Sequence, residues 1–163
     1  SFTKVRAPGL RLGCVVAPKS VYGKLGQAKQ AADLHTPSFN QRVVAEVMKD
    51  GFLDRHIPTI RTLYKNQRDA MLAALDQEMV GLGVSWTRPV GGMFLWVQLP
   101  EGMDAQKLLP LAVERGMAFV PGAPFFPGNP QHNCLRLSYV TVPPAQIAQG
   151  IAALAAAIKA YVQ

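Results

Sequence analysis

A lysine and an arginine near the start of the sequence are the first residues whose types and spacing suggest a site. Lys4 lies in a short polar segment, and Arg11 lies in an apolar run, residues 10–16, whose alternating side chains predict a strand. An arginine in such a strand is costly to bury unless an anion meets it. Pro8-Gly9 between them is typical of a turn. We therefore predict that Lys4 and Arg11 converge on one anionic ligand.

A second arginine stands alone among apolar residues near the end of the sequence. Residues 134–140 predict a strand in which Leu135 and Leu137 share one face and Arg136 takes the other. The planar guanidinium of arginine matches a carboxylate or a phosphate with two parallel hydrogen bonds. The two strand arginines therefore predict two anion sites. The alternative for Arg136 is a salt bridge to a carboxylate of the protein itself.

Residues 1–13 resemble the lysine motif of fold-type I pyridoxal-phosphate enzymes. The class I/II aminotransferase form of this motif is Ser-Phe-Ser/Thr-Lys-x-x-x-Pro-Gly-x-Arg-x-Gly, and the sequence fills every fixed position. The resemblance implies that Lys4 is the catalytic lysine that binds pyridoxal 5'-phosphate covalently. It also implies that Arg11 and the hydroxyl of Ser1 hold the cofactor phosphate. The alternative is a solvated lysine and an arginine at a strand end.

Further segments resemble the same family, in the same order along the chain. Residues 34–41 and the helical stretch 56–69 are similar to segments of this aminotransferase group. Arg136 matches the family's arginine that clamps the substrate α-carboxylate. Gly92, in Gly-Gly-Met-Phe, resembles a segment that lines the substrate entrance, and its alternative is a hairpin turn before a core strand.

The function that the resemblance implies is transfer of an amino group from an L-amino acid to a 2-oxo acid, in a homodimer whose partner subunit completes the active site. The closest similarity is to the group handling 2-aminoadipate, aromatic and branched-chain amino acids. One alternative is the cofactor-binding effector domain of a winged-helix transcription regulator, the only interpretation with a nucleic-acid partner. Another is a lyase on the same scaffold. The sequence upstream of Ser1 decides the first alternative, and the reaction products decide the second.

Several cofactor contacts of the family lie upstream of its lysine, and none of them is in this sequence. They are the loop that caps the phosphate, the aromatic residue over the ring, the Asn and Tyr at the ring hydroxyl, and the Asp at the pyridine nitrogen. The sequence opens at Ser1, inside the motif. We therefore expect the chain to be the C-terminal piece of a longer enzyme, and to bind cofactor poorly and not to transaminate by itself.

The composition is that of a folded protein without clustered charge. Of 163 residues, 49% are hydrophobic and 17% charged, which excludes a disordered chain. The net charge is +7, but the basic residues are scattered, so the composition does not by itself predict nucleic-acid binding. No apolar run free of charge has membrane-spanning length, and the histidines lack metal-ligand spacing. Cys14 and Cys134 are predicted to be buried, reduced thiols of a cytoplasmic protein.

The order of helical and strand patterns predicts an α/β fold. We expect a remnant of the cofactor-binding large domain at 1–51, a linking helix at 52–80 and a small C-terminal α/β domain at 81–163. Ser38 is predicted to cap a helix, Pro58 to lie in a first helical turn, and Asp104 to begin a helix that stops at Gly116. Helices are predicted at 19–32, 39–49, 53–79, 104–115 and from about 141; strands at 10–16, 84–87, 93–99, 117–120 and 134–140.

Overall fold

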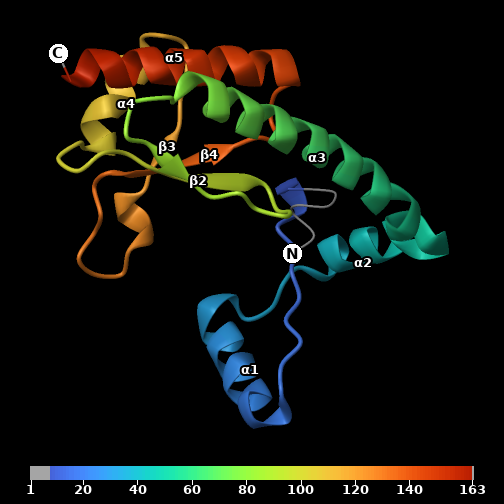
Figure 1. Cartoon of the computed structure of the whole chain (residues 1–163). Helices are drawn as coiled ribbons and strands as arrows, with labels where there is room; N and C mark the ends of the chain where they lie inside the picture. The colour runs from blue at the N-terminus through green and yellow to red at the C-terminus, as the bar shows by residue number, and fades with distance from the viewer. Residues whose placement is uncertain (1–7, 163) are drawn as a thin grey trace. The chain divides into compact units, whose positions relative to one another are not determined.

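The computed structural model describes residues 8–162 of the chain, which divides into two compact units, Ser1–Ile60 and Arg61–Gln163. The boundary between the units falls inside helix α3 (Phe52–Glu78). Figure 1 shows the order of the elements along the chain. The division of the chain at residues 51 and 80 stays a prediction.

The first unit is helical and buries little apolar surface. It holds a 3-10 turn η2 (Pro8–Leu10), helices α1 (Lys19–Asp33) and α2 (Ser38–Val47), a 3-10 turn η3 (Lys49–Gly51) and the beginning of α3. No residue of α1 is buried, and α2 buries only Val44. The Asn40 side-chain amide donates a hydrogen bond of 3.2 Å to the carbonyl of Leu10, which ties α2 to the end of η2.

The prediction of a strand at residues 10–16 is wrong. Residues 11–18 have no regular secondary structure, Arg11 has a φ of 48°, and Cys14 is exposed rather than buried. A strand needs a neighbour to pair its backbone groups. Within residues 8–162 all paired strands lie between Ser85 and Ser138, in the second unit. The apolar alternation of 10–16 therefore has no described partner strand.

Two predictions about the beginnings of helices are also wrong. Ser38 is the first residue of α2 and makes no capping hydrogen bond; Pro37 takes the N-cap position. Pro58 lies inside α3, beyond the first turn, because the helix already begins at Phe52. The long helix itself and its bounds confirm the amphipathic pattern of 53–79.

The second unit is built around a four-stranded antiparallel sheet of order β1-β2-β4-β3. Its centre is the pairing of β2 with β4, in which Trp96 lies opposite Arg136. Helices α4 and α5 and the second half of α3 complete the unit, and α3 and α5 lie over the same face of the sheet (Figure 1). The bounds are β1 (Ser85–Trp86), β2 (Phe94–Gln98), α4 (Ala105–Val113), β3 (Val120–Pro121), a 3-10 turn η4 (Ala123–Phe125), β4 (Cys134–Ser138) and α5 (Pro144–Val162).

Alternation along β2 and β4 sends one set of side chains into the core and the other to the opposite face. Leu95, Leu135 and Leu137 are buried in one cluster with apolar residues of α3, α4 and α5, whereas Arg136 is only half-buried. This confirms the predicted faces of the strand at 134–140. The core therefore fixes which side of the sheet Arg136 occupies.

Truncating a core leucine of this sheet should destabilise the chain strongly. Leu135 is fully buried, so Leu135→Ala removes packed atoms and leaves a cavity. We expect a loss of about 2–5 kcal/mol in the free energy of unfolding, measured by urea denaturation. The matched control is Leu63→Ala on α3, where the side chain is 50% exposed. A loss for Leu135→Ala no larger than that for Leu63→Ala would contradict this placement of the core.

The predicted start of the fourth helix is confirmed, but the helix ends at Val113, before the predicted stop at Gly116, and a turn follows it. Asp104 is the N-cap of α4, and its Oδ1 accepts a hydrogen bond of 2.8 Å from the backbone N–H of Gln106. Gly116 ends the segment with a φ of 79°, a conformation that glycine adopts without strain.

Removing the Asp104 cap should cost the chain about 1 kcal/mol in thermal or urea unfolding, because the N–H of Gln106 loses its acceptor. Asp104→Asn is the control, since its carbonyl oxygen can accept the same bond. The expected loss is that of Asp104→Ala. Equal losses of stability in Asp104→Ala and Asp104→Asn would contradict this role of the Asp104 side chain.

Helix α5 is long and apolar enough to cross a membrane by length and composition alone. In the structure, however, Ile147, Ile151, Leu154 and Ile158 lie in the core cluster. Its apolar character is therefore explained by packing.

Candidate functional site

Arg136 lies on the sheet face opposite the core, against two aromatic rings. The guanidinium carbon is 4.1 Å from the ring centroid of Phe94 and 4.8 Å from that of Phe125. These contacts are made by the flat faces of the guanidinium. Its N–H groups lie in the plane, so the ring contacts do not use them. Among the residues that the structure describes, no carboxylate forms an ion pair with Arg136. The guanidinium is therefore positioned but not neutralised, and it is available to bind an anion.

Three aromatic residues, Phe94, Trp96 and Phe125, lie beside Arg136, and we call them the aromatic cluster. The rings of Trp96 and Phe125 meet edge to face, with centroids 5.7 Å apart and an interplanar angle of 80°. Phe126 also contacts Trp96, at 6.1 Å. A cation with free N–H donors beside apolar rings suits a ligand that joins a carboxylate to an apolar body.

The sequence analysis missed Phe125 as a member of the site. The sequence does contain a signal: two consecutive aromatic residues follow Pro121-Gly122-Ala123-Pro124. Adjacent aromatic residues in an exposed loop indicate a contact with other residues or with a ligand. Phe125 remains 48% exposed, although it contacts both Trp96 and Arg136.

The other predicted cation, Arg11, lies in the first unit and is exposed. Within residues 8–162 it takes part in no ion pair, so its guanidinium is free to meet a phosphate. Lys4 and Ser1 lie outside the described residues. The convergence of Lys4 and Arg11 on one anion therefore stays a prediction.

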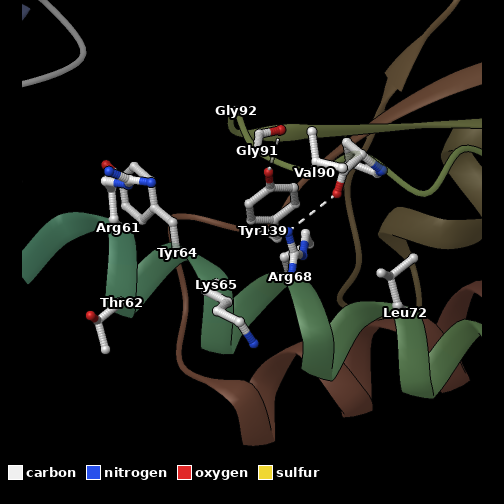
Figure 2. Close-up of a pocket in the computed structure, with 11 residues that line it drawn as sticks. Arg61, Thr62, Tyr64, Lys65, Arg68, Leu72, Val90, Gly91, Gly92 and Tyr139 are labelled. Carbon is white, nitrogen blue, oxygen red and sulfur yellow. Dashed lines mark hydrogen bonds between the residues drawn. The ribbon is translucent and has the colours of Figure 1, made fainter. Parts of the chain in front are cut away.

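Gly92 does not share the Arg136 site but lines a separate cavity of about 570 Å³ (Figure 2). The cavity lies between α3 and the segment 89–92, and the Tyr139 hydroxyl donates a hydrogen bond of 3.3 Å to the carbonyl of Gly91 in its wall. Burial raises the pKa of Tyr139, so the hydroxyl stays protonated and able to donate. Gly92 has a φ of 91°, which favours glycine at this position.

The charged residues of α3 that line this cavity differ in their exposure to solvent. Lys65 and Asp69 are exposed and form an ion pair of 2.6 Å. Arg68 is only 17% exposed in its side chain, donates to the carbonyl of Pro89 at 3.3 Å and also pairs with Asp69. Hydrogen bonds from Lys65 and then Arg68 lower the pKa of Asp69. Two of the cavity's cations are thereby already paired.

The remaining chemical candidates carry no site. Cys134 is buried, as predicted, and its thiol lies 3.5 Å from Oε1 of Gln131. In the part of the chain that the structure describes, no group of histidine, cysteine and acidic residues could hold a metal ion.

Comparison with known proteins bears out the resemblance of the lysine motif. The family description "Aminotransferase class I and II" matches residues 2–154. A 2-aminoadipate transaminase of Thermus thermophilus is 48% identical over 159 residues, and an aromatic-amino-acid aminotransferase of Thermococcus litoralis is 45% identical; each match covers 98% of this chain. The chain spans only 40% and 38% of the lengths of these two relatives.

The similarity extends to the fold. An α-aminoadipate aminotransferase from Thermus thermophilus, solved as a complex with N-(5'-phosphopyridoxyl)-L-leucine, superimposes with a TM-score of 0.90 at 47% identity. The match covers 99% of this chain and 41% of that one. This confirms the predicted α/β fold as the C-terminal part of such a structure.

A more distant relative has a different role. An uncharacterized HTH-type transcriptional regulator of Bacillus subtilis is 30% identical over 159 residues, which cover 98% of this chain and 32% of the regulator. Its identity is lower than that of the two aminotransferases, and the match to the family description spans nearly all of the sequence. The chain belongs to the class I and II aminotransferase family.

Proposed function

We propose that this chain is the C-terminal part of a pyridoxal-phosphate-dependent aminotransferase that moves an amino group from an L-amino acid to a 2-oxo acid. The observation that carries the proposal is Arg136, an unneutralised guanidinium stacked on Phe94 and Phe125. Amino acids and 2-oxo acids share one anionic group, the carboxylate next to the reacting carbon. A fixed guanidinium that binds this carboxylate can therefore hold the amino acid that gives up the amino group and also the 2-oxo acid that receives it.

The resemblance of residues 1–13 to the family's lysine motif supports a site for pyridoxal phosphate at Lys4. Arg11 lies in the described part of that motif, is exposed and forms no ion pair within residues 8–162, so it fits a phosphate ligand. We propose that Arg11 and the Ser1 hydroxyl bind the cofactor phosphate and that Lys4 holds the cofactor covalently. The cofactor, when bound, supplies the electron sink for chemistry at the substrate Cα. Once the substrate amine had displaced it from the cofactor, the amine of Lys4 would be free to take up and return the proton of the substrate Cα.

We also propose Gly92 as a substrate contact. It resembles the family segment at the substrate entrance, and it lines the cavity beside Gly91 and Tyr139. Its φ of 91° lets the backbone approach a ligand without a side chain intervening.

The test of the proposed function is a product assay on the complete protein that carries this chain, loaded with pyridoxal phosphate. With an L-amino acid and 2-oxoglutarate we expect glutamate and the matching 2-oxo acid in equal amounts. Formation of an elimination or decarboxylation product, without glutamate, would show a lyase instead. We expect the 163-residue chain alone to be inactive in the same assay, because the family's remaining cofactor contacts lie outside it.

The relative in Bacillus subtilis favours a second candidate, the cofactor-binding effector domain of a transcription regulator. This candidate predicts a basic winged-helix segment upstream of Ser1 and specific DNA binding by the complete protein. A gel-shift assay with the DNA upstream of its own gene distinguishes the two, since the aminotransferase has no reason to shift it.

We further propose that the complete protein is a cytoplasmic homodimer, as the fold-type I resemblance implies. Light scattering coupled to gel filtration of the complete protein measures the assembly directly, and a monomeric mass would contradict it.

A further inference from the structure

Gly122 holds the loop before η4 tightly against β4. Its backbone N–H donates a hydrogen bond of 2.7 Å to the carbonyl of Cys134. A Cβ built on Gly122 would lie 2.7 Å from the Cβ of Cys134 and 2.8 Å from its carbonyl oxygen. Carbon atoms do not approach so closely without displacement, and the opposing atoms are backbone and a buried residue. Only glycine therefore fits here.

The same loop carries Phe125, whose ring contacts Arg136. η4 (Ala123–Phe125) follows Gly122 directly and is closed by the hydrogen bond from Phe125 N–H to the Gly122 carbonyl, 2.9 Å. Phe125 at its end contacts the guanidinium and the edge of Trp96. The next residue, Phe126, contacts Trp96 but has no ring contact with Arg136. The backbone position of Gly122 thus determines where the Phe125 ring lies.

We propose that Phe125 and Gly122 are positioning residues for carboxylate binding by Arg136. The Phe125 ring restrains the plane of the guanidinium, and Gly122 sets the distance of that ring from β4. A long arginine side chain that is restrained before binding loses less conformational entropy when it grips a carboxylate. The inference rests on the proposed role of Arg136 in binding the substrate carboxylate.

The first arm of the test compares adjacent phenylalanines in the complete, cofactor-loaded enzyme. The substrates are an L-amino acid and the primary amine that lacks its carboxylate. For Phe125→Leu we expect kcat/KM for the amino acid to fall roughly three-fold to ten-fold, mainly through KM, with the amine nearly unchanged. Phe125→Tyr keeps the aromatic face and should stay within about two-fold of the parent. Phe126→Leu is the control and should not change the ratio of amino acid to amine.

The second arm compares two loop glycines. Gly122→Ala should lower the same ratio at least as much as Phe125→Leu, because it displaces the whole loop. Gly128→Ala is the matched control, since a Cβ there meets nothing within 4 Å. If Gly122→Ala does not fold, as judged by its melting temperature, the Phe125 variants still decide the question.

The outcomes separate this inference from the proposed function. If Arg136→Leu lowers the ratio but Phe125→Leu behaves like Phe126→Leu, the positioning role is refuted and the function stands. Equal losses for amino acid and amine in Phe125→Leu refute it too, because they indicate a general structural defect. If Arg136→Leu itself leaves the ratio unchanged, the carboxylate role of Arg136 falls, and this inference falls with it.

Discussion

Replacing Arg136 by leucine in the complete enzyme is expected to lower kcat/KM for amino acids and 2-oxo acids by roughly thirty-fold to several thousand-fold, which corresponds to about 2–5 kcal/mol. The reason is the loss of two charge-assisted hydrogen bonds to the substrate carboxylate. The aromatic cluster makes this loss specific, because the leucine still packs against Phe94 and Phe125 and the sheet need not rearrange.

Steady-state kinetics with both substrates measures the effect, and Arg136→Lys refines it. Lysine keeps the charge but not the planar fork, so we expect partial activity, between that of leucine and arginine. Arg115→Leu is the control: Arg115 is exposed and donates to the carbonyl of Leu111. Full activity of Arg136→Leu would show that the carboxylate binds elsewhere.

Replacing Lys4 by alanine should be the more severe change. The proposed role of Lys4 combines covalent attachment of the cofactor with proton transfer at the substrate Cα. The proton-transfer role alone predicts a fall in kcat of about a hundred-fold to ten-thousand-fold. We therefore expect turnover of an amino acid and 2-oxoglutarate to drop to near the background of free cofactor.

Lys4→Arg tests whether charge alone matters, because arginine keeps the cation but is effectively always protonated and cannot take up the proton. It should be as inactive as Lys4→Ala. Lys19→Ala, at the exposed beginning of α1, is the control and should keep full activity. Appreciable turnover by Lys4→Ala would assign the catalytic amine to a different residue.

The helices were predictable from the sequence because their signals are local. The Asp104 cap and the helix from about residue 141 each depend on signals within one element, and the structure confirms both. The strand at 134–140 was also predictable. Its alternation places Leu135 in the core and Arg136 on the other face, and β2 is there to pair with it.

The strand at 10–16 failed for the complementary reason. Alternation shows that a segment could be one face of a sheet, but pairing requires a second strand that the segment itself does not encode. The predicted burial of Cys14 failed with it.

The place of Phe125 in the aromatic cluster was missed because a loop has no periodic pattern of side chains from which its conformation can be predicted. Nothing in the spacing of Phe125 and Arg136 predicts that their side chains meet. The contact depends on the turn of η4 and on the close approach of Gly122 to Cys134, which are properties of the folded backbone. The sequence did single out Arg136, because it is a lone cation in an apolar strand, and its role in binding a carboxylate stays a prediction.

The most direct measurement of the central claim is the location of the cofactor on the complete protein. Reduction with borohydride makes the bond between the lysine amine and pyridoxal phosphate permanent, and peptide mass mapping then identifies the modified residue. We expect a single modified residue, Lys4. Modification of another lysine, or no bound cofactor at all, would contradict the assignment of this chain to the catalytic centre of an aminotransferase.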